Sequence, residues 1–153
     1  KETVAEVGLL GSSTEGRPNK LLVSLFSIER ETAGGISSVR QSAQGETAQG
    51  SPPIYVNLHV LFAAMYDEKR YTEGLSVLSG TMLFIQSHTA FLYEGNTYTL
   101  EMVTPTPQDL NNIWTSMGGQ YHPSVMCKLR RLTFDAGEIR RSSRSINKPI
   151  VEI

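Results

Sequence analysis

The segment from Ile54 to Met65 constrains the fold of this chain more than any other part of its sequence. Its large apolar side chains recur at every second position, at Ile54, Val56, Leu58, Val60 and Phe62. The positions between them mix polar and apolar groups, namely Tyr55, Asn57, His59, Leu61 and Ala63. Successive side chains of a β-strand point to opposite faces, so this repeat predicts a central β-strand. Its polar side chains must then be paired within the chain or face another chain.

Four further segments are predicted to be strands from their composition and alternation. They are an edge strand at Glu2–Leu10, a β-prone run at Leu21–Glu31, a short strand at Tyr98–Val103 after a turn at Gly95–Asn96, and a last strand after Pro123. In the last strand, apolar residues up to Leu129 share one face, whereas Leu132 and Phe134 fall on the other. One inserted residue would return them to the core side, so we predict a β-bulge near Arg130–Arg131.

A first helix is predicted from Glu68 to Phe91, because apolar residues recur there at spacings of three and four. The apolar stripe consists of Tyr71, Leu75, Leu78, Met82 and Ile85. Gly74 and Gly80 lower the helix propensity of this segment and allow another element to pack closely against it.

A second helix is predicted to begin at Pro107, with Thr106 as its N-cap and Asp109 completing a capping box. Its buried face is expected to consist of Leu110, Ile113, Trp114 and Met117. Gly118–Gly119 is predicted to end the helix.

The composition between Thr32 and Pro53 changes to Gly, Ser, Gln and Ala, which predicts a long polar loop. We therefore predict an α+β fold in which a sheet of four to five strands, antiparallel or mixed, packs its apolar face on the two helices. One such domain is expected over residues 1–135, with loop 32–53 inside it and a basic and apolar C-terminal arm over residues 136–153.

The 153 residues suffice for one hydrophobic core without disulfides. The single cysteine, Cys127, is predicted to be a small buried residue, which suits assembly in a reducing compartment. The longest nearly uncharged run, Ile54–Tyr66, is too short to span a membrane. No charged and then apolar leader is visible, so we expect a soluble protein without an export signal.

No catalytic, cofactor or metal site is predicted. His59, His88 and His122 lack the spacing of metal ligands. Gly118–Gly119 follows a helix, whereas loops that bind phosphate precede one. Ser124 lacks the Gly-x-Ser-x-Gly turn of a hydrolase nucleophile.

Seven of the 14 Lys and Arg residues lie from position 128 onward, although the net charge is only −1. They are Lys128, Arg130, Arg131, Arg140, Arg141, Arg144 and Lys148. This basic end fits an acidic protein neighbour, a solvated tail or, less well, nucleic acid, because it lacks interleaved aromatic residues.

Four ordered blocks of the sequence, spread over Leu21–Phe134, resemble one known family. They are the strand Leu22–Leu25 ending in Ile28–Glu31, the run "PPIYVNL" from Pro52, the helical Leu78-Ser79-Gly80, and the block with Leu110, Trp114, Gly118-Gly119, Tyr121 and Pro123-Ser124-Val125. The chain is similar in these blocks to the cap, or tail-terminator, family of phage-tail-like contractile injection systems. The family pattern also leads us to expect an amphipathic helix ahead of Thr3, so the sequence is expected to be a fragment.

The resemblance implies a structural protein without cofactor, small-molecule substrate, nucleic acid or membrane span. Such a cap would form a ring with itself, expected to be a homohexamer, on the distal end of the inner tube and sheath, and would stop their polymerisation. Its partners would be the inner tube protein and the sheath protein, and it would assemble in the cytoplasm. A small nucleic-acid-binding module is the alternative, and an unrecognised enzyme a third.

The residues expected at the interfaces with other subunits, sheath or tube come from the central strand, the polar loop and the basic end. They are Tyr55, Asn57, His59, Arg40, Lys128, Arg130, Arg140, Arg141, Arg144, Ile146, Ile150 and Val151.

Overall fold

The computed structural model describes residues 4–10, 19–32, 39–41, 47–49, 53–116 and 120–134. The chain divides into two compact units. One unit consists of Lys1–Glu29 and Asn57–Arg130, and the other of Arg30–Val56 and Arg131–Ile153. Both helices belong to the first unit. The predicted domain end at position 135 and the arm beyond it lie outside the described residues and stay predictions.

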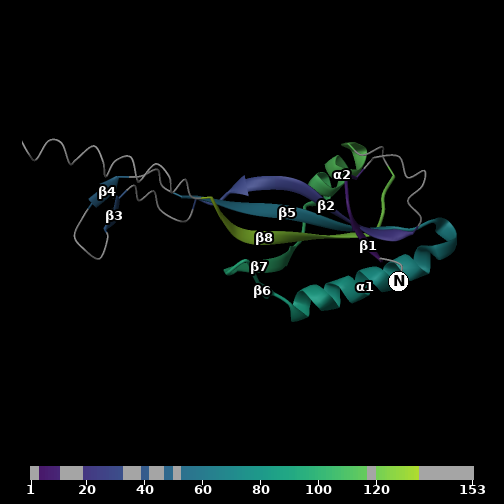
Figure 1. The fold of residues 1–153 in the computed structure, drawn as a ribbon. Coiled ribbons are helices and arrows are strands. Elements are labelled where there is room, and N and C mark those ends of the chain that lie inside the picture. Colours follow the sequence, from purple (N-terminus) through teal and green to yellow (C-terminus); the bar gives the residue numbers. More distant parts are fainter. Residues whose placement is uncertain are drawn as a thin grey trace, which may run out of the picture. The chain divides into compact units, whose positions relative to one another are not determined.

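The main sheet has six strands in the order β1-β2-β5-β8-β7-β6 (Figure 1). The strands are β1 (Ala5–Val7), β2 (Lys20–Arg30), β5 (Ile54–Met65), β6 (Ala90–Tyr93), β7 (Asn96–Val103) and β8 (Ser124–Phe134). β1 runs parallel to β2, whereas β6 and β8 run antiparallel to β7. The α+β class and the mixed sheet are therefore confirmed, but the predicted number of four to five strands is wrong.

β5 is the central strand that the sequence predicts, and hydrogen bonds show how its neighbours run. The backbone amide of Asp67, just after β5, donates to Oδ1 of Asn19, just before β2, at 2.9 Å. The amide of Ala64, near the end of β5, donates to the carbonyl of Pro123, just before β8, at 2.9 Å. The end of β5 thus lies beside the starts of β2 and β8, so both run antiparallel to it.

The sixth strand, β6, lies where the sequence predicts the end of the first helix. That helix is shorter than expected: a 3-10 turn η1 (Glu68–Arg70) leads into α1 (Tyr71–Ser87). Ala90–Tyr93 instead pairs with β7 through a turn at Glu94 and Gly95, whose φ angles are 47° and 77°. Two successive positive φ angles define the type I′ turn that suits a two-residue hairpin. The prediction of helix up to Phe91 is therefore wrong.

α1 packs one side on the sheet, as its apolar stripe predicts. Leu78 and Ile85 are buried and Met82 is half-buried, whereas Tyr71 and Leu75 at the start of the stripe are exposed. Leu78 belongs to a core cluster with Leu21, Ala64 and Tyr66.

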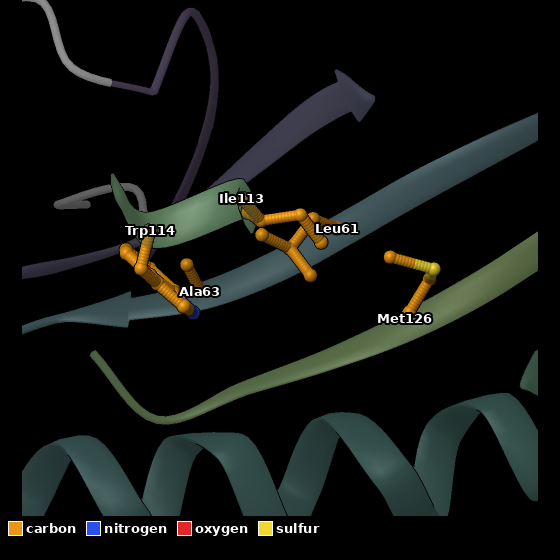
Figure 2. Close-up of a cluster of buried hydrophobic side chains, with 5 residues drawn as sticks. All are labelled: Leu61, Ala63, Ile113, Trp114 and Met126. Atoms are coloured by element: carbon orange, nitrogen blue, oxygen red, sulfur yellow. The ribbon is translucent and has the colours of Figure 1, made fainter. Parts of the chain in front are cut away.

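α2 (Pro107–Ser116) begins as predicted. The hydroxyl of Thr106 accepts the amide of Asp109 at 3.1 Å and donates to its carboxylate at 2.6 Å. Ile113 and Trp114 are buried with Leu61, Ala63 and Met126 (Figure 2). Leu110 packs against this cluster. The predicted end of the helix at Met117 and Gly118–Gly119 lies outside the described residues.

The two helices cover opposite faces of the sheet (Figure 1). Ala63 packs in the cluster of α2 and the next residue, Ala64, packs in the cluster of α1. Neighbouring residues of a strand point to opposite faces. The expectation that one apolar face carries both helices is therefore wrong, and it is wrong because both sides of β5 are buried near its end.

Two local predictions remain. Arg131 on β8 has φ 68°, a left-handed conformation that fits the predicted irregularity near Arg130–Arg131. The predicted loop 32–53 is not free of strands, because β3 (Val39–Gln41) and β4 (Thr47–Gln49) pair antiparallel in a separate two-stranded sheet.

Candidate assembly surfaces

Two basic residues predicted at an interface, Lys128 and Arg130, form ion pairs within the chain. Nζ of Lys128 lies 2.9 Å from Oε2 of Glu29 on β2, and Nη1 of Arg130 lies 3.5 Å from Oε1 of Glu101 on β7. β5 separates β2 from β8 in the sheet, so the first pair reaches across the central strand. Because carboxylates already neutralise these cations, they are less available to phosphate or to an acidic partner.

The predicted interface residues of β5 differ in accessibility. Asn57 is only 1% exposed, so its side chain is part of the interior of the chain. His59 and Tyr55 are half-buried, and the guanidinium of Arg131 lies 5.7 Å from the ring centroid of Tyr55. The structure therefore leaves His59 and Tyr55 partly available to a partner.

The remaining predicted interface residues are mostly outside the described part of the chain. Arg40 lies on β3, for which the structure gives the backbone pairing. The residues of the C-terminal arm are outside the described residues, namely Arg140, Arg141, Arg144, Ile146, Ile150 and Val151.

The structure reveals a surface that the sequence predictions missed, which we call the uncharged surface. It comprises exposed apolar side chains of α1, namely Leu75, Leu83 and Phe84, and of the side of β6 that faces α1, namely Phe91 and Tyr93. Leu83 is 72% exposed. The side chains of a surface helix that face solvent are usually charged or polar. Exposed apolar clusters of this kind mark contacts with other proteins.

The sequence carries a signal for this surface. The 20 residues from Gly74 to Tyr93 contain no Asp, Glu, Lys or Arg. From Tyr71 to Cys127 there is no Lys or Arg at all. The lack of charged residues is visible in the sequence, but it is equally typical of a buried helix. Only the fold shows that these side chains are exposed.

Trp114 is a core residue, as predicted, and is surrounded by aromatic rings. Its ring centroid lies 5.6 Å from that of Tyr121 and 5.8 Å from that of His122. Burial lowers the pKa of His122, because the cluster disfavours the charged imidazolium.

Cys127 is fully buried on β8, and this burial raises the pKa of its thiol to about 11. A thiol with such a pKa is almost entirely protonated at neutral pH and is a poor nucleophile. Within the described ranges, no three His, Cys, Asp or Glu residues form a group that could hold a metal ion. Neither α1 nor α2, the described helices, is long and apolar enough to cross a membrane.

The family model described as the Pvc16 N-terminal domain matches residues 3–148, almost the whole sequence. The chain belongs to this family. The predicted relationship to cap proteins of phage-tail-like contractile injection systems is thereby confirmed.

Among solved structures, the chain is similar to the anti-feeding prophage cap, the AFP tube terminating cap, determined by cryo-EM. The TM-score is 0.59 at 14% sequence identity, and the match covers 84% of this chain. It covers 48% of that cap, so the chain spans about half the length of the protein it resembles. At this identity the match shows a shared fold. Comparison with curated protein sequences gave no match.

Proposed function

We propose that this chain is part of a structural cap that forms a ring on the distal end of the inner tube and sheath of a contractile injection system. The ring is expected to contain six copies and to stop further addition of tube and sheath subunits. The observation that carries this proposal is membership of the Pvc16 N-terminal domain family, together with the fold shared with a tube terminating cap. The role requires no catalysis and no cofactor.

Physical reasoning supports the need for such a protein. A tube of stacked rings is a heterologous assembly that does not close along its axis, so nothing in the tube itself ends its growth. A terminator must match the last ring on one side and must not present a copy of that surface on the other. Stable binding to the tube and sheath is sufficient for this task.

The uncharged surface supports an assembly role, because neighbouring exposed residues such as Leu83 and Phe84 on a helix are typical of a surface that another protein covers. We propose that this surface contacts a neighbouring subunit or the tube, in addition to Tyr55, His59 and the C-terminal arm. Leu83→Lys should weaken assembly with little effect on the stability of the subunit, because Leu83 is 72% exposed. Asn112→Lys, at an exposed position of α2 on the other side of the sheet, is the matched control and should assemble normally.

The basic arm is proposed to orient the cap through charge complementarity with a protein neighbour. Arg140→Glu combined with Arg141→Glu should then weaken attachment mainly at low salt, where screening is least. The nucleic-acid alternative gains no support from the described part of the basic end, where Lys128 and Arg130 are paired with Glu29 and Glu101.

The full-length purified protein can be tested by size-exclusion chromatography and negative-stain electron microscopy. The proposal predicts closed rings, alone or in the presence of the cognate inner tube protein and sheath protein. A protein that stays monomeric at high concentration, and also forms no rings with those partners, would contradict it. The same particles, imaged by electron microscopy inside the intact producing cells, would show whether assembly takes place in the cytoplasm.

A further inference from the structure

The main sheet has an open edge at each end, formed by β1 and by β6. Within the described part of the chain, β1 is hydrogen-bonded to β2 alone and β6 to β7 alone. Both strands belong to the same compact unit. Their residues are all exposed except Glu6, which is half-buried. Free backbone groups on such edges are templates for pairing with a strand of another chain.

The register of the hairpin shows which backbone groups of β6 are free. Tyr93 closes the two-residue turn, and a closing residue exchanges both backbone hydrogen bonds with its partner on β7. The pattern alternates from there, in agreement with the hydrogen bond from the amide of Leu100 to the carbonyl of Thr89 at 2.9 Å. The N–H and C=O groups of Ala90 and Leu92 therefore point away from β7, toward the open edge.

The hydrogen bonds of β1 define the other edge in the same way. The carbonyl of Val4 accepts a hydrogen bond from β2 at 2.9 Å, and the amide of Gly8 donates one to β2 at 3.1 Å. Residues that face the neighbouring strand alternate with residues that face away from it. The N–H and C=O groups of Ala5 and Val7 therefore point outward.

The two edge strands run in the same direction. β1 is parallel to β2, and each of the four steps from β2 through β5, β8 and β7 to β6 is antiparallel. An even number of reversals gives β6 the direction of β1. A second copy that continues the sheet in the same orientation therefore presents its β1 parallel to β6.

The apolar side chains of the two edges lie on the same face of the sheet. Ala5 lies opposite Leu21, which belongs to the core cluster of α1, so Ala5 and Val7 are on the face that α1 covers. The register from β8 through β7 places Phe91 and Tyr93 on that face too. A sheet that continues from one copy into the next thus keeps these side chains together.

We propose that β6 pairs in parallel with β1 of a second copy, so that the main sheets of adjacent copies join edge to edge. β1 has three residues and β6 has four, which leaves two registers without overhang. In a parallel pair, a residue that faces the partner strand lies opposite one that faces away. Only one register meets this condition. It places Tyr93 opposite Val7 of the second copy and Leu92 opposite Glu6.

Apolar contact and charge both favour this pairing. Val7 is 83% exposed and Tyr93 60%, so both have surface to bury, and their contact extends the uncharged surface. β6 contains no charged residue, and the only one in β1 is Glu6. Glu6 lies on the other face of the sheet, where its Oε2 is 3.5 Å from Nζ of Lys20. The pairing therefore leaves this carboxylate beside its own cation.

One contact of this kind serves both edges of every copy. Four strands separate β1 from β6 within the sheet, but each copy can offer β6 to one neighbour and β1 to the next. Such a head-to-tail contact is heterologous and forms a closed ring when the rotation between copies closes. The inference deepens the proposed function, because it names the contact between ring neighbours; only the closed ring rests on that function.

Paired cysteine substitutions in the full-length protein test the contact. Directly opposite residues of paired strands have Cα atoms about 5 Å apart, within the range of a disulfide. The variant with both Val7→Cys and Tyr93→Cys, two exposed positions, should give a ladder of covalent multimers on a non-reducing gel after mild oxidation. A mixture of the two single variants should give covalent dimers and nothing larger. Each single variant alone should give no cross-link.

Val7→Cys combined with Leu92→Cys is the matched control. Leu92 is more exposed than Tyr93, at 73%, but its side chain lies on the other face of the sheet. Random collisions would cross-link this variant at least as readily, whereas the proposed pairing predicts no ladder from it. The unmodified protein should give no multimers either, because Cys127 is fully buried.

Two results would overturn the inference: no ladder from the variant with Val7→Cys and Tyr93→Cys, or an equal ladder from the control with Leu92→Cys. Dimers from Phe91→Cys alone would also contradict it, because they indicate a two-fold pairing of β6 with β6. If rings form without the ladder, this contact is wrong and the proposed function stands. If the ladder forms but tubes stay uncapped, the proposed function fails and the contact stands.

Discussion

Gly74 on α1 lies directly against the ring of Tyr66, so that a Cβ atom added at Gly74 would lie 2.9 Å from Cδ2 and Cγ of that ring. Tyr66 is buried in the cluster that joins α1 to the sheet. Non-bonded carbon atoms are normally separated by at least about 3.5 Å, so either α1 or the tyrosine must move to accept a methyl group.

Gly74→Ala should therefore destabilise the protein by about 1–3 kcal/mol, despite the better helix propensity of alanine. Gly80→Ala is the matched control, because a Cβ atom at Gly80 meets nothing within 4 Å. It should gain roughly 0.5–1 kcal/mol. The midpoints of urea unfolding measure both changes, and a stabilising Gly74→Ala would show that the close contact with Tyr66 does not exist.

Thr106→Ala should cost about 1 kcal/mol of unfolding free energy, because the amide of Asp109 loses its acceptor at the start of α2. Thr106→Ser keeps the hydroxyl oxygen and should restore most of the stability. Chemical unfolding of the two variants distinguishes the loss of the N-cap hydrogen bond from other effects of the substitution. Equal losses in both variants would show that the methyl group, and not the hydroxyl, matters at this position.

Lowering the pH should destabilise the folded chain through His122. Burial places the pKa of His122 below its ordinary value in the folded state, so the unfolded state takes up its proton first as the pH falls. The contribution of His122 is fully present above the unfolded pKa of about 6.5 and is lost as the pH falls from there toward the folded pKa. The unfolding free energy of His122→Gln should accordingly fall less between about pH 7 and pH 5 than that of the unmodified protein. Identical pH dependence of the two proteins would exclude a buried neutral imidazole.

Cys127 should resist alkylation in the folded protein, because its thiol is fully buried and its pKa is raised to about 11. Iodoacetamide at mildly alkaline pH should label the protein slowly without denaturant and rapidly in concentrated urea. Mass spectrometry of the labelled protein gives the two rates. Complete labelling of the native protein within minutes would show that β8 opens easily or that the thiol is accessible.

The sequence predicted those features that depend on local chemistry. The N-cap at Thr106 is recognisable because its partner, Asp109, lies three positions away. The central strand is recognisable because its alternation extends over many residues. The strand Ala90–Tyr93 was not recognisable in this way, because an apolar run of only four residues fits the end of a helix as well as a strand. Pairing with β7 makes this segment a strand. The tight turn between the two strands requires a positive φ angle at Glu94, which is unusual for a residue other than glycine.

The candidate surfaces were less predictable than the fold. Lys128 and Glu29 are almost a hundred positions apart, so their ion pair depends on a sheet order that the sequence does not reveal. Asn57 was expected at an interface because a polar group on a central strand needs a partner, yet the fold buries it within the chain. The exposure of Leu83 was not predicted, because it depends on which side of α1 faces the sheet.

The length of the inner tube tests the proposed capping most directly. The cognate tube protein can be polymerised with and without the full-length protein, and the tubes compared by negative-stain electron microscopy. The proposal predicts shorter tubes, each closed at one end by a ring that antibodies against this protein label. Tubes of unchanged length with bare ends, at protein concentrations that saturate all tube ends, would contradict it.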